Sequence, residues 1–258
     1  MTLPVSGPYP TAEKPQEEPA EISYQVRFDL PAKKPWVTYV ILGICVVFFG
    51  LQMLSEAFLG GDLPFTLLGK INEYIRAGQV WRLFTPALLH GSIAHLGFNM
   101  YALYAIGPIL EQHYGHKRFL VLFVLGAFAG NVFSFAFSTR PALGASTALF
   151  GIIAAQGVFI YQNRFLFKDA RSALINTIVI VIINLVLGLR PGIDNWGHLG
   201  GLLGGLGFAW FAGPVWRPEG MPPVLVIKDQ HEGQRVIWAA LGVFVLFSLG
   251  FIVRLLIP

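Results

Sequence analysis

The chain turns from a short polar loop to a long apolar run at Gly144-Ala145-Ser146-Thr147-Ala148-Leu149-Phe150-Gly151. Such a change is typical of the start of a helix, with Ser146 in or beside the first turn. Because backbone N–H groups at a helix N-terminus favour negative charge, a serine here can act as a nucleophile whose oxyanion is stabilised. Gly144 lets the loop before it turn sharply. The alternative is that Ser146 only caps the helix, which is a common use of serine.

Polar side chains in other apolar segments favour a nucleophilic role for Ser146 over a capping role. A polar group inside a bilayer is costly, so each one needs a functional or structural reason. His95 and Asn99 are four residues apart and therefore share one helical face, where both can direct donors toward an oxyanion. Interhelical hydrogen bonding is the alternative for this pair. His90 falls on a different face at the helix entrance, and for it a structural hydrogen bond is as reasonable as catalysis.

A downstream histidine lies in a glycine-rich segment, Trp196-Gly197-His198-Leu199-Gly200-Gly201-Leu202-Leu203-Gly204-Gly205. Gly197, Gly201 and Gly205 recur every four residues and form a stripe without side chains, which lets two helices approach closely. A serine and a histidine on neighbouring helices need such an approach to come within about 2.6–3.2 Å of each other. The alternative is plain tight packing, with His198 bonded to a carbonyl.

The composition indicates an all-α polytopic membrane protein. Of the 258 residues, 55% are hydrophobic and 12% are charged, and the mean hydropathy is +0.62. Runs long enough to cross a bilayer, about 17–25 residues each, predict seven helices. We place these at about 36–54, 93–110, 119–137, 146–161, 173–189, 196–211 and 236–257. The runs from 146 and from 196 are short, so both helices should begin below the outer surface.

Basic residues set the expected orientation. They gather before the first helix and after the second, fourth and sixth, so these loops should face the cytoplasm. Ser146 and His198 then lie toward the outer face, where they can meet. The same residues account for the net charge of +4 without a nucleic-acid partner. They are Lys33, Lys34, Lys117, Arg118, Arg164, Lys168, Arg171, Arg217, Lys228 and Arg235.

The chain divides into four expected segments. Residues 1–35 are rich in proline and glutamate and should form a disordered cytoplasmic tail. Residues 36–213 should form a six-helix core, 214–235 a cytoplasmic linker and 236–258 a seventh transmembrane helix. Within the core, the connection from 60 to 90 is too long for a turn, and its apolar and charged residues are too mixed for a transmembrane helix. We therefore expect a partly helical loop in the outer interface.

Metal and redox chemistry are not indicated. The zinc-protease motif needs two histidines four residues apart with a glutamate between them, whereas His90 and His95 are five apart and Glu111 is distant. Cys45 is the single cysteine and can form no intrachain disulfide. We therefore expect neither a metal nor a cofactor.

These motifs resemble those of the rhomboid intramembrane serine proteases, from about residue 36 to 213. The resemblance is carried, in the family's order, by Trp81-Arg82, His90, His95, Asn99, Glu111, Gly115, Gly144-Ala145-Ser146, His198, Gly201 and Gly205. It implies that Ser146 is the nucleophile and His198 the general base, with no aspartate. It also implies that His95, Asn99 and the Ser146 N–H bind the oxyanion.

Two positions near the serine carry further expectations. Phe150 stands one helical turn after Ser146, where family members often have an aromatic residue packed against the catalytic histidine. Thr147 departs from the family, because many relatives have glycine there. We expect its side chain to narrow the approach of the substrate.

The resemblance implies an endopeptidase that cuts other membrane proteins within or beside a transmembrane helix. We expect a multi-pass protein of a bacterial inner membrane, with its N-terminus in the cytoplasm. Its partners would be transmembrane protein substrates and the lipid bilayer. The alternative is an inactive scaffold that binds transmembrane helices, which loss of Ser146 or His198 would mark. A small-solute transporter would need paired interrupted helices in both halves of the chain, and the interruptions here do not pair.

Overall fold

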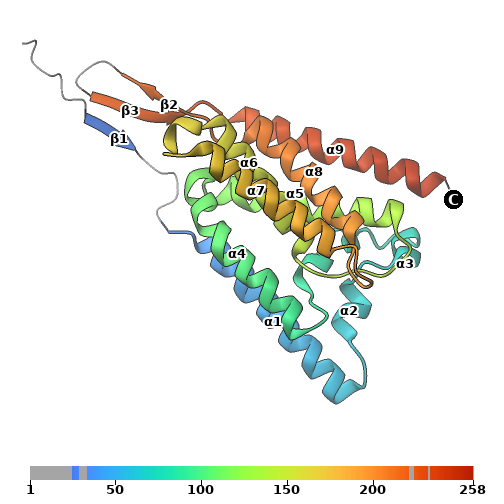
Figure 1. The fold of residues 1–258 in the computed structure, drawn as a ribbon. Coiled ribbons are helices and arrows are strands. Elements are labelled where there is room, and N and C mark those ends of the chain that lie inside the picture. Colours follow the sequence, from blue (N-terminus) through green and yellow to red (C-terminus); the bar gives the residue numbers. More distant parts are fainter. Residues whose placement is uncertain (1–24, 29–33, 221–223, 232, 258) are drawn as a thin grey trace, which may run out of the picture.

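Helices dominate the computed structural model, which describes residues 25–28, 34–220, 224–231 and 233–257 (Figure 1). Seven long helices begin within three residues of the predicted positions, so the all-α polytopic fold class is confirmed. They are α1 (Trp36–Leu59), α4 (Ile93–Tyr114), α5 (His116–Phe137), α6 (Ser146–Gln162), α7 (Ala170–Leu187), α8 (Asn195–Ala212) and α9 (Gln234–Leu256).

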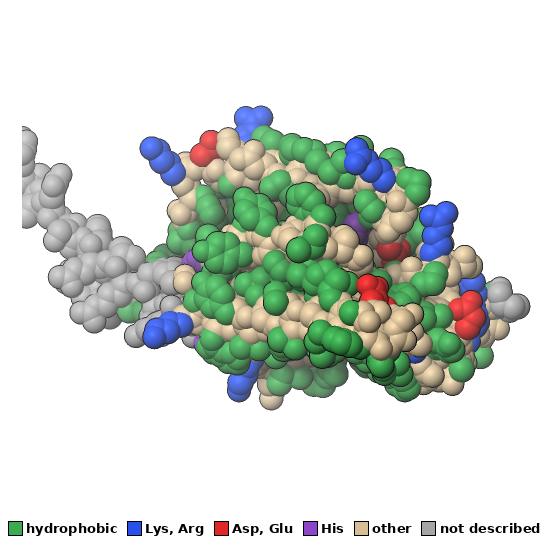
Figure 2. Space-filling view, turned by 90° about the horizontal axis from the view of Figure 1, so that it is seen from below, with side chains coloured by type: hydrophobic (Ala, Val, Ile, Leu, Met, Phe, Trp, Pro, Cys, Tyr) green, Lys and Arg blue, Asp and Glu red, His purple; other side chains and the backbone are tan. Residues whose placement is uncertain are grey.

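Five of the described helices are long and apolar enough to cross a membrane, namely α1, α4, α5, α7 and α9. Helix α6 is apolar but has only 17 residues, and α8 is rich in glycine. On the face shown in Figure 2, hydrophobic side chains cover the middle of the molecule, while Lys and Arg side chains lie around its edge. This distribution suits a protein held within a bilayer.

The connection between α1 and α4 is partly helical, as predicted. It contains α2 (Leu63–Leu68), α3 (Asn72–Arg76) and the 3₁₀ turns η1 (Val80–Leu83) and η2 (Thr85–Leu88). A third 3₁₀ turn, η3 (Arg164–Leu166), follows α6. Arg82 is buried and donates to the carbonyls of Gly69 and Thr66, at 2.7 and 2.6 Å. These hydrogen bonds hold the two halves of the connection together.

The same connection is joined to the loop that precedes α6. Lys70 pairs with Ala142 in an isolated antiparallel bridge, and its ammonium group donates to the carbonyls of Ser138 and Arg140 at 2.9 and 3.0 Å. The N–H of Gly144 donates to the carbonyl of Pro86 at 2.9 Å. The first long loop thus fixes the backbone immediately before Ser146.

A small sheet at the end of the bundle was not predicted. Its order is β1 (Gln25–Phe28), β3 (Val224–Asp229), β2 (Trp216–Glu219), with β1 parallel and β2 antiparallel to β3. The expected linker at 214–235 is therefore a strand pair. The predicted disorder does not hold for residues 25–28, because β3 pairs with their backbone groups. The rest of the predicted tail before residue 34 lies outside the described residues.

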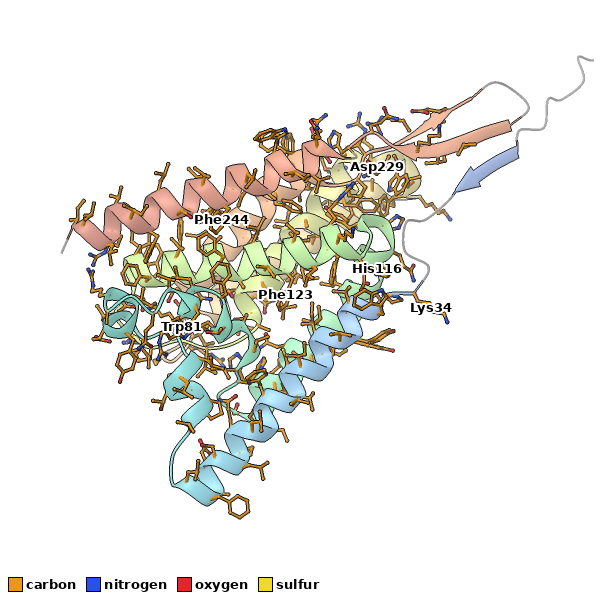
Figure 3. All side chains as sticks on the ribbon, turned by 180° about the vertical axis from the view of Figure 1, so that it is seen from behind. Lys34, Trp81, His116, Phe123, Asp229 and Phe244 are labelled. Carbon is orange, nitrogen blue, oxygen red and sulfur yellow. The ribbon has the colours of Figure 1, made fainter. Side chains whose placement is uncertain are left out.

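Glu111, at the end of α4, satisfies the start of α1. Its carboxylate is fully buried and accepts from the N–H groups of Val37 and Thr38 at 3.0 and 2.7 Å. The Thr38 hydroxyl donates to it at 2.6 Å, and the Nδ1 atom of His116 lies 2.5 Å from it. Because Pro35 provides no side-chain cap, a carboxylate from α4 neutralises the partial positive charge at this helix end. Figure 3 labels His116 beside this junction.

Helix α9 covers α5 from outside the six-helix core. Phe244 of α9 stacks on Phe128 of α5 with ring centroids 4.9 Å apart, and Figure 3 shows Phe244 directed toward the other helices. At the sheet end, Asp229 pairs with Arg118 at 2.8 Å. Aromatic packing therefore holds the seventh helix to the core, and the ion pair joins β3, which precedes this helix, to α5.

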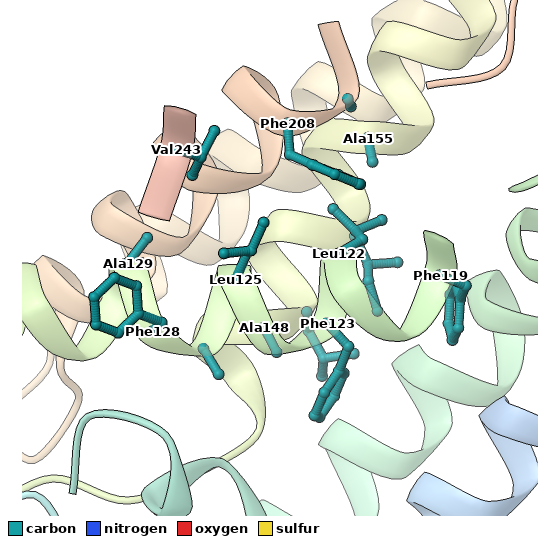
Figure 4. Packing of buried hydrophobic residues seen from close by; sticks show 14 of the residues in the cluster. Phe119, Leu122, Phe123, Leu125, Phe128, Ala129, Ala148, Ala155, Phe208 and Val243 are labelled. Atoms are coloured by element: carbon teal, nitrogen blue, oxygen red, sulfur yellow. The ribbon is translucent and has the colours of Figure 1, made fainter. Parts of the chain in front are cut away.

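The hydrophobic core surrounds α5. Figure 4 shows Leu122, Leu125 and Phe128 of α5 together with Phe208 of α8 and Val243 of α9. Small residues next to these side chains let the helices pack closely against one another. A Cβ added to Gly204 of α8 would collide with that of Ala129 on α5. Tight packing of α5, α6 and α8 is therefore built on positions that have no room for a side chain.

Candidate active site

Ser146 is the first residue of α6 and does not cap it. The residue at the cap position is Ala145, and no side chain provides a cap hydrogen bond. The hydroxyl is directed elsewhere, because Ser146 Oγ lies 2.9 Å from His198 Nε2. The capping alternative therefore does not describe this serine.

The glycine stripe of α8 makes this contact geometrically possible. A Cβ added to Gly201 would overlap the backbone carbonyl of Thr147, and one added to Gly205 would overlap the backbone of Gly151. The stripe therefore packs directly against the first turns of α6. Since backbone meets backbone here, the side chains at the start of α6 can reach His198 on α8.

The ring of His198 is held on one side by Phe150. The two ring centroids are 4.4 Å apart and the planes are inclined by 17°. His198 is 7% exposed, so the orientation of its ring is set by packing rather than by solvent. Ser146 itself is half-buried, which leaves a route for water to its hydroxyl.

Asp194 supports the start of α8 and was not singled out from the sequence. It is the cap residue of the helix, and its Oδ1 accepts from the N–H of Gly197 at 3.1 Å. Its carbonyl accepts from the N–H of His198 at 3.1 Å, and its charge acts electrostatically on both His198 and Lys70. An aspartate immediately before an apolar helix was the available signal.

His95 lies beside the loop that leads to Ser146. A Cβ added to Gly144 would be 2.7 Å from the Cε1 and Nε2 atoms of His95, and Gly144 has a φ of +131°, which favours glycine. The N–H of Gly91 donates to His95 Nδ1 at 3.4 Å. With Nδ1 accepting, the neutral ring carries its proton on Nε2, the atom that faces this loop.

Asn99 and His90 both contact His95. Asn99 is 6% exposed and donates one amide hydrogen to the carbonyl of His95 at 3.1 Å, so the other hydrogen is available to a ligand. The ring of His90 meets His95 edge-on, with centroids 5.2 Å apart. Its backbone N–H donates to Gln52 Oε1 at 3.0 Å. His90 thus packs behind His95 and joins it to α1.

Thr147 does not narrow the approach to Ser146. Its side chain is buried, at 6% exposure, and lies between Gly130 of α5 and Gly197 of α8. Cβ atoms added to those glycines would fall within 2.6 and 3.0 Å of it. The prediction is therefore wrong for a geometric reason. One residue further along a helix is rotated by about 100°, which turns Thr147 into the bundle while Ser146 faces the site.

Across the described part of the chain, no group of three or more His, Cys, Asp or Glu side chains is arranged to hold a metal ion. The Ser146 hydroxyl is instead bonded to the imidazole of His198, and the ring of His95 lies beside the loop that leads to the serine. A hydroxyl bonded to an imidazole is the arrangement used for acyl transfer.

The fold and this site define a polytopic membrane protein with a serine–histidine pair at the start of a short helix. The Rhomboid domain family matches residues 77–215. The chain therefore belongs to the rhomboid family, and the suspected resemblance is confirmed.

Several relatives are similar over most of the chain. The rhomboid protease GluP of Bacillus subtilis (strain 168) is 39% identical over 173 residues, which are 67% of this chain and 34% of the relative. RHOMBOID-like protein 1 of Arabidopsis thaliana is 32% identical over 204 residues, covering 74% of this chain and 52% of that protein. RHOMBOID-like protein 5 is 33% identical, covering 73% and 66%. The chain thus spans between about a third and two thirds of these relatives.

Proposed function

We propose that this protein is an intramembrane serine endopeptidase that cuts transmembrane segments of other membrane proteins. The observation that carries the proposal is the 2.9 Å hydrogen bond between Ser146 Oγ and His198 Nε2. Membership of the rhomboid family and similarity to a rhomboid protease support it. The alternative, an inactive scaffold, gives no reason for a hydroxyl and an imidazole to be paired in a buried site.

Acylation would proceed from this pair. His198 Nε2 takes the proton of the Ser146 hydroxyl as Oγ attacks the carbonyl carbon of the scissile peptide bond. The tetrahedral intermediate then breaks down when His198 returns the proton to the leaving nitrogen. This releases one fragment and leaves the other as an ester on Ser146.

Deacylation would use the same groups. His198 removes a proton from a water molecule that attacks the ester carbonyl, and it then protonates Oγ as the second fragment leaves. Because Ser146 is only half-buried, water can reach it from the loop side of the bundle. No third residue has to accept a proton in either step.

Three donors are suited to the oxyanion. The N–H of Ser146 belongs to the first turn of α6, whose N–H groups have no partner within the helix. His95 offers Nε2–H and Asn99 offers its second amide hydrogen, as their other bonds indicate. Donors held in place before the reaction stabilise the developing charge at little cost in reorganisation.

The expected surroundings are a bacterial inner membrane, with the N-terminus in the cytoplasm and Ser146 toward the opposite side. The basic residues that follow α4, α6 and α8 support this orientation. Substrates would be transmembrane proteins whose helices unwind easily near the cut. A backbone that remains hydrogen-bonded within a helix cannot present its carbonyl to Ser146 and the oxyanion donors together.

The proposal is tested by reconstituting the full chain in liposomes with a fluorescent transmembrane substrate that carries small residues near its end. Ser146→Ala and His198→Ala should each abolish cleavage while the circular dichroism of the helices stays unchanged. Gly207→Ala is a matched control, because a Cβ there meets only Val243, at an ordinary 3.5 Å. Cleavage that persists in either active-site variant would refute the mechanism.

A further inference from the structure

A basic hollow lies at the end of the bundle remote from Ser146. It has a volume of about 710 Å³ and lies where α6 and α8 end and β2 begins. Ser146 begins α6 and Tyr161 is near its end, so a rise of about 1.5 Å per residue separates the two by roughly 22 Å. The hollow is therefore separate from the site around Ser146.

Three arginines surround the hollow. Arg164, Arg217 and Arg235 all line it and all are exposed. Among the described residues, none of the three pairs with a carboxylate. Two of them donate hydrogen bonds to backbone carbonyls, Arg235 Nε to Phe211 at 3.2 Å and Arg217 to Trp216 at 2.8 Å. Each guanidinium has five donors, so several remain for an anion.

Asp229 and Glu219, at this end of the molecule, have partners other than the three arginines. Asp229 pairs with Arg118 at 2.8 Å and accepts from the N–H of Val215. Glu219 pairs with Lys228 at 3.3 Å and accepts from Gln230. No acidic side chain lines the hollow among the described residues. Within the described residues, the positive charge of the three arginines is therefore not neutralised at the hollow.

Aromatic side chains form the bundle side of the hollow. Tyr161 and Trp210 stack with ring centroids 5.9 Å apart, and both are about half exposed. Phe211 is also exposed beside them. Tyrosine and tryptophan favour the level of the lipid headgroups. The hollow thus has apolar and aromatic walls from the ends of α6 and α8, and guanidinium groups from η3, β2 and α9.

We propose that this hollow binds an anionic phospholipid of the leaflet that the sheet end faces. The phosphate would lie among Arg164, Arg217 and Arg235, and the acyl chains would run along the exposed faces of Trp210 and Phe211. Arginine suits a phosphate because its planar fork can bind two oxygens at once. Basic pockets between transmembrane helices are a recurring means of holding such lipids. The inference does not depend on proteolysis.

Lipid binding to the full chain in a neutral detergent can be measured by native mass spectrometry. The probes are dioleoylphosphatidylglycerol, dioleoylphosphatidylcholine with the same acyl chains, and inorganic phosphate. We expect the first to bind at least ten-fold more tightly than the second. Replacing one arginine should weaken it about five-fold, and the double variant Arg217→Gln/Arg235→Gln about 25-fold. Should the double variant be unstable, the single variant Arg164→Gln tests the same hollow.

The matched control is Arg140→Gln/Arg190→Gln, which removes the same charge from exposed positions at the Ser146 end. It should leave binding unchanged. Equal weakening by the control would mean that only overall charge matters, and equal binding of phosphatidylcholine would mean that the arginines do not select the headgroup. Displacement of the lipid by an equal concentration of inorganic phosphate would indicate a free-phosphate site. Each of these results would overturn the proposal.

Discussion

Phe150 and His198 lie ring against ring, with centroids 4.4 Å apart and planes inclined by 17°. They come from different helices, α6 and α8, and Phe150 is one turn beyond the serine to which His198 is bonded. The imidazole is thereby held between a hydroxyl and an aromatic face. In a pair without a bonded aspartate, this packing can fix the orientation of the base.

Phe150→Leu should therefore impair catalysis more than folding. Loss of the aromatic pair costs about 0.5–1.5 kcal/mol of stability, whereas a displacement of the base by about 1 Å lowers the rate on the order of a hundredfold. We expect kcat to fall on that scale with little change in KM. Phe119→Leu, at an equally buried position, should lower the melting temperature without lowering kcat. A kcat unchanged by Phe150→Leu would show that the stacking does not position His198.

Asn99→Ala tests the oxyanion donors. Removing one strong donor costs roughly 2.7–4 kcal/mol of transition-state stabilisation, so kcat should fall about a hundredfold to a thousandfold while KM stays nearly constant. Asn131 is the matched control, because it is 2% exposed and its amide donates to the carbonyls of Leu83 and Ala127. Asn131→Ala should reduce stability alone. If Asn99→Ala changed KM alone, the residue would bind substrate instead.

Gly201→Ala tests the contact between α8 and α6. The added methyl group would overlap the carbonyl of Thr147, so the helices must separate, whereas in Gly207→Ala it meets only Val243 at 3.5 Å. Overpacking costs about 1–3 kcal/mol, but the separation also lengthens the Ser146–His198 bond. Peptide cleavage should fall at least tenfold in Gly201→Ala and remain normal in Gly207→Ala. Equal activity in the two variants would contradict the geometry described here.

Glu111→Gln addresses stability at the junction of α1 and α4. The side-chain amide of glutamine has one acceptor oxygen instead of two, so it can accept from fewer of the N–H and hydroxyl donors that Glu111 now satisfies. Its NH₂ group would face the remaining donors. An unsatisfied buried donor costs about 1–3 kcal/mol. The melting temperature, followed by tryptophan fluorescence in detergent, should therefore drop by several degrees. Glu56→Gln, at an exposed position of α1, should leave it unchanged, and equal melting of the two variants would exclude the capping role.

The helices and the meeting of Ser146 with His198 could be predicted because the signals are strong and local. Apolar runs define the spans, and a glycine stripe implies close approach whatever the details of packing. The side chain of Thr147 was misplaced although the helix begins at the predicted residue, Ser146. Consecutive residues differ by about 100° around a helix, and which of them face the bundle depends on how α5 and α8 pack against α6.

The sheet and the role of Asp194 could not be predicted for a different reason. Strand β1 pairs with β3 across nearly two hundred residues, and such a pairing leaves no local pattern in either segment. Asp194 looks like any helix cap in the sequence. That its charge also reaches Lys70 and His198 follows only from the folded arrangement of the loops.

The nucleophile can be identified directly with a fluorophosphonate probe. The full chain in detergent is incubated with the probe, digested, and searched by mass spectrometry for the modified residue. We expect one adduct, on Ser146, which is absent in Ser146→Ala and at least a hundredfold slower to form in His198→Ala, because the base is missing. Labelling that persists in Ser146→Ala, or that forms at the same rate without His198, would show that these two residues are not the nucleophile and its base.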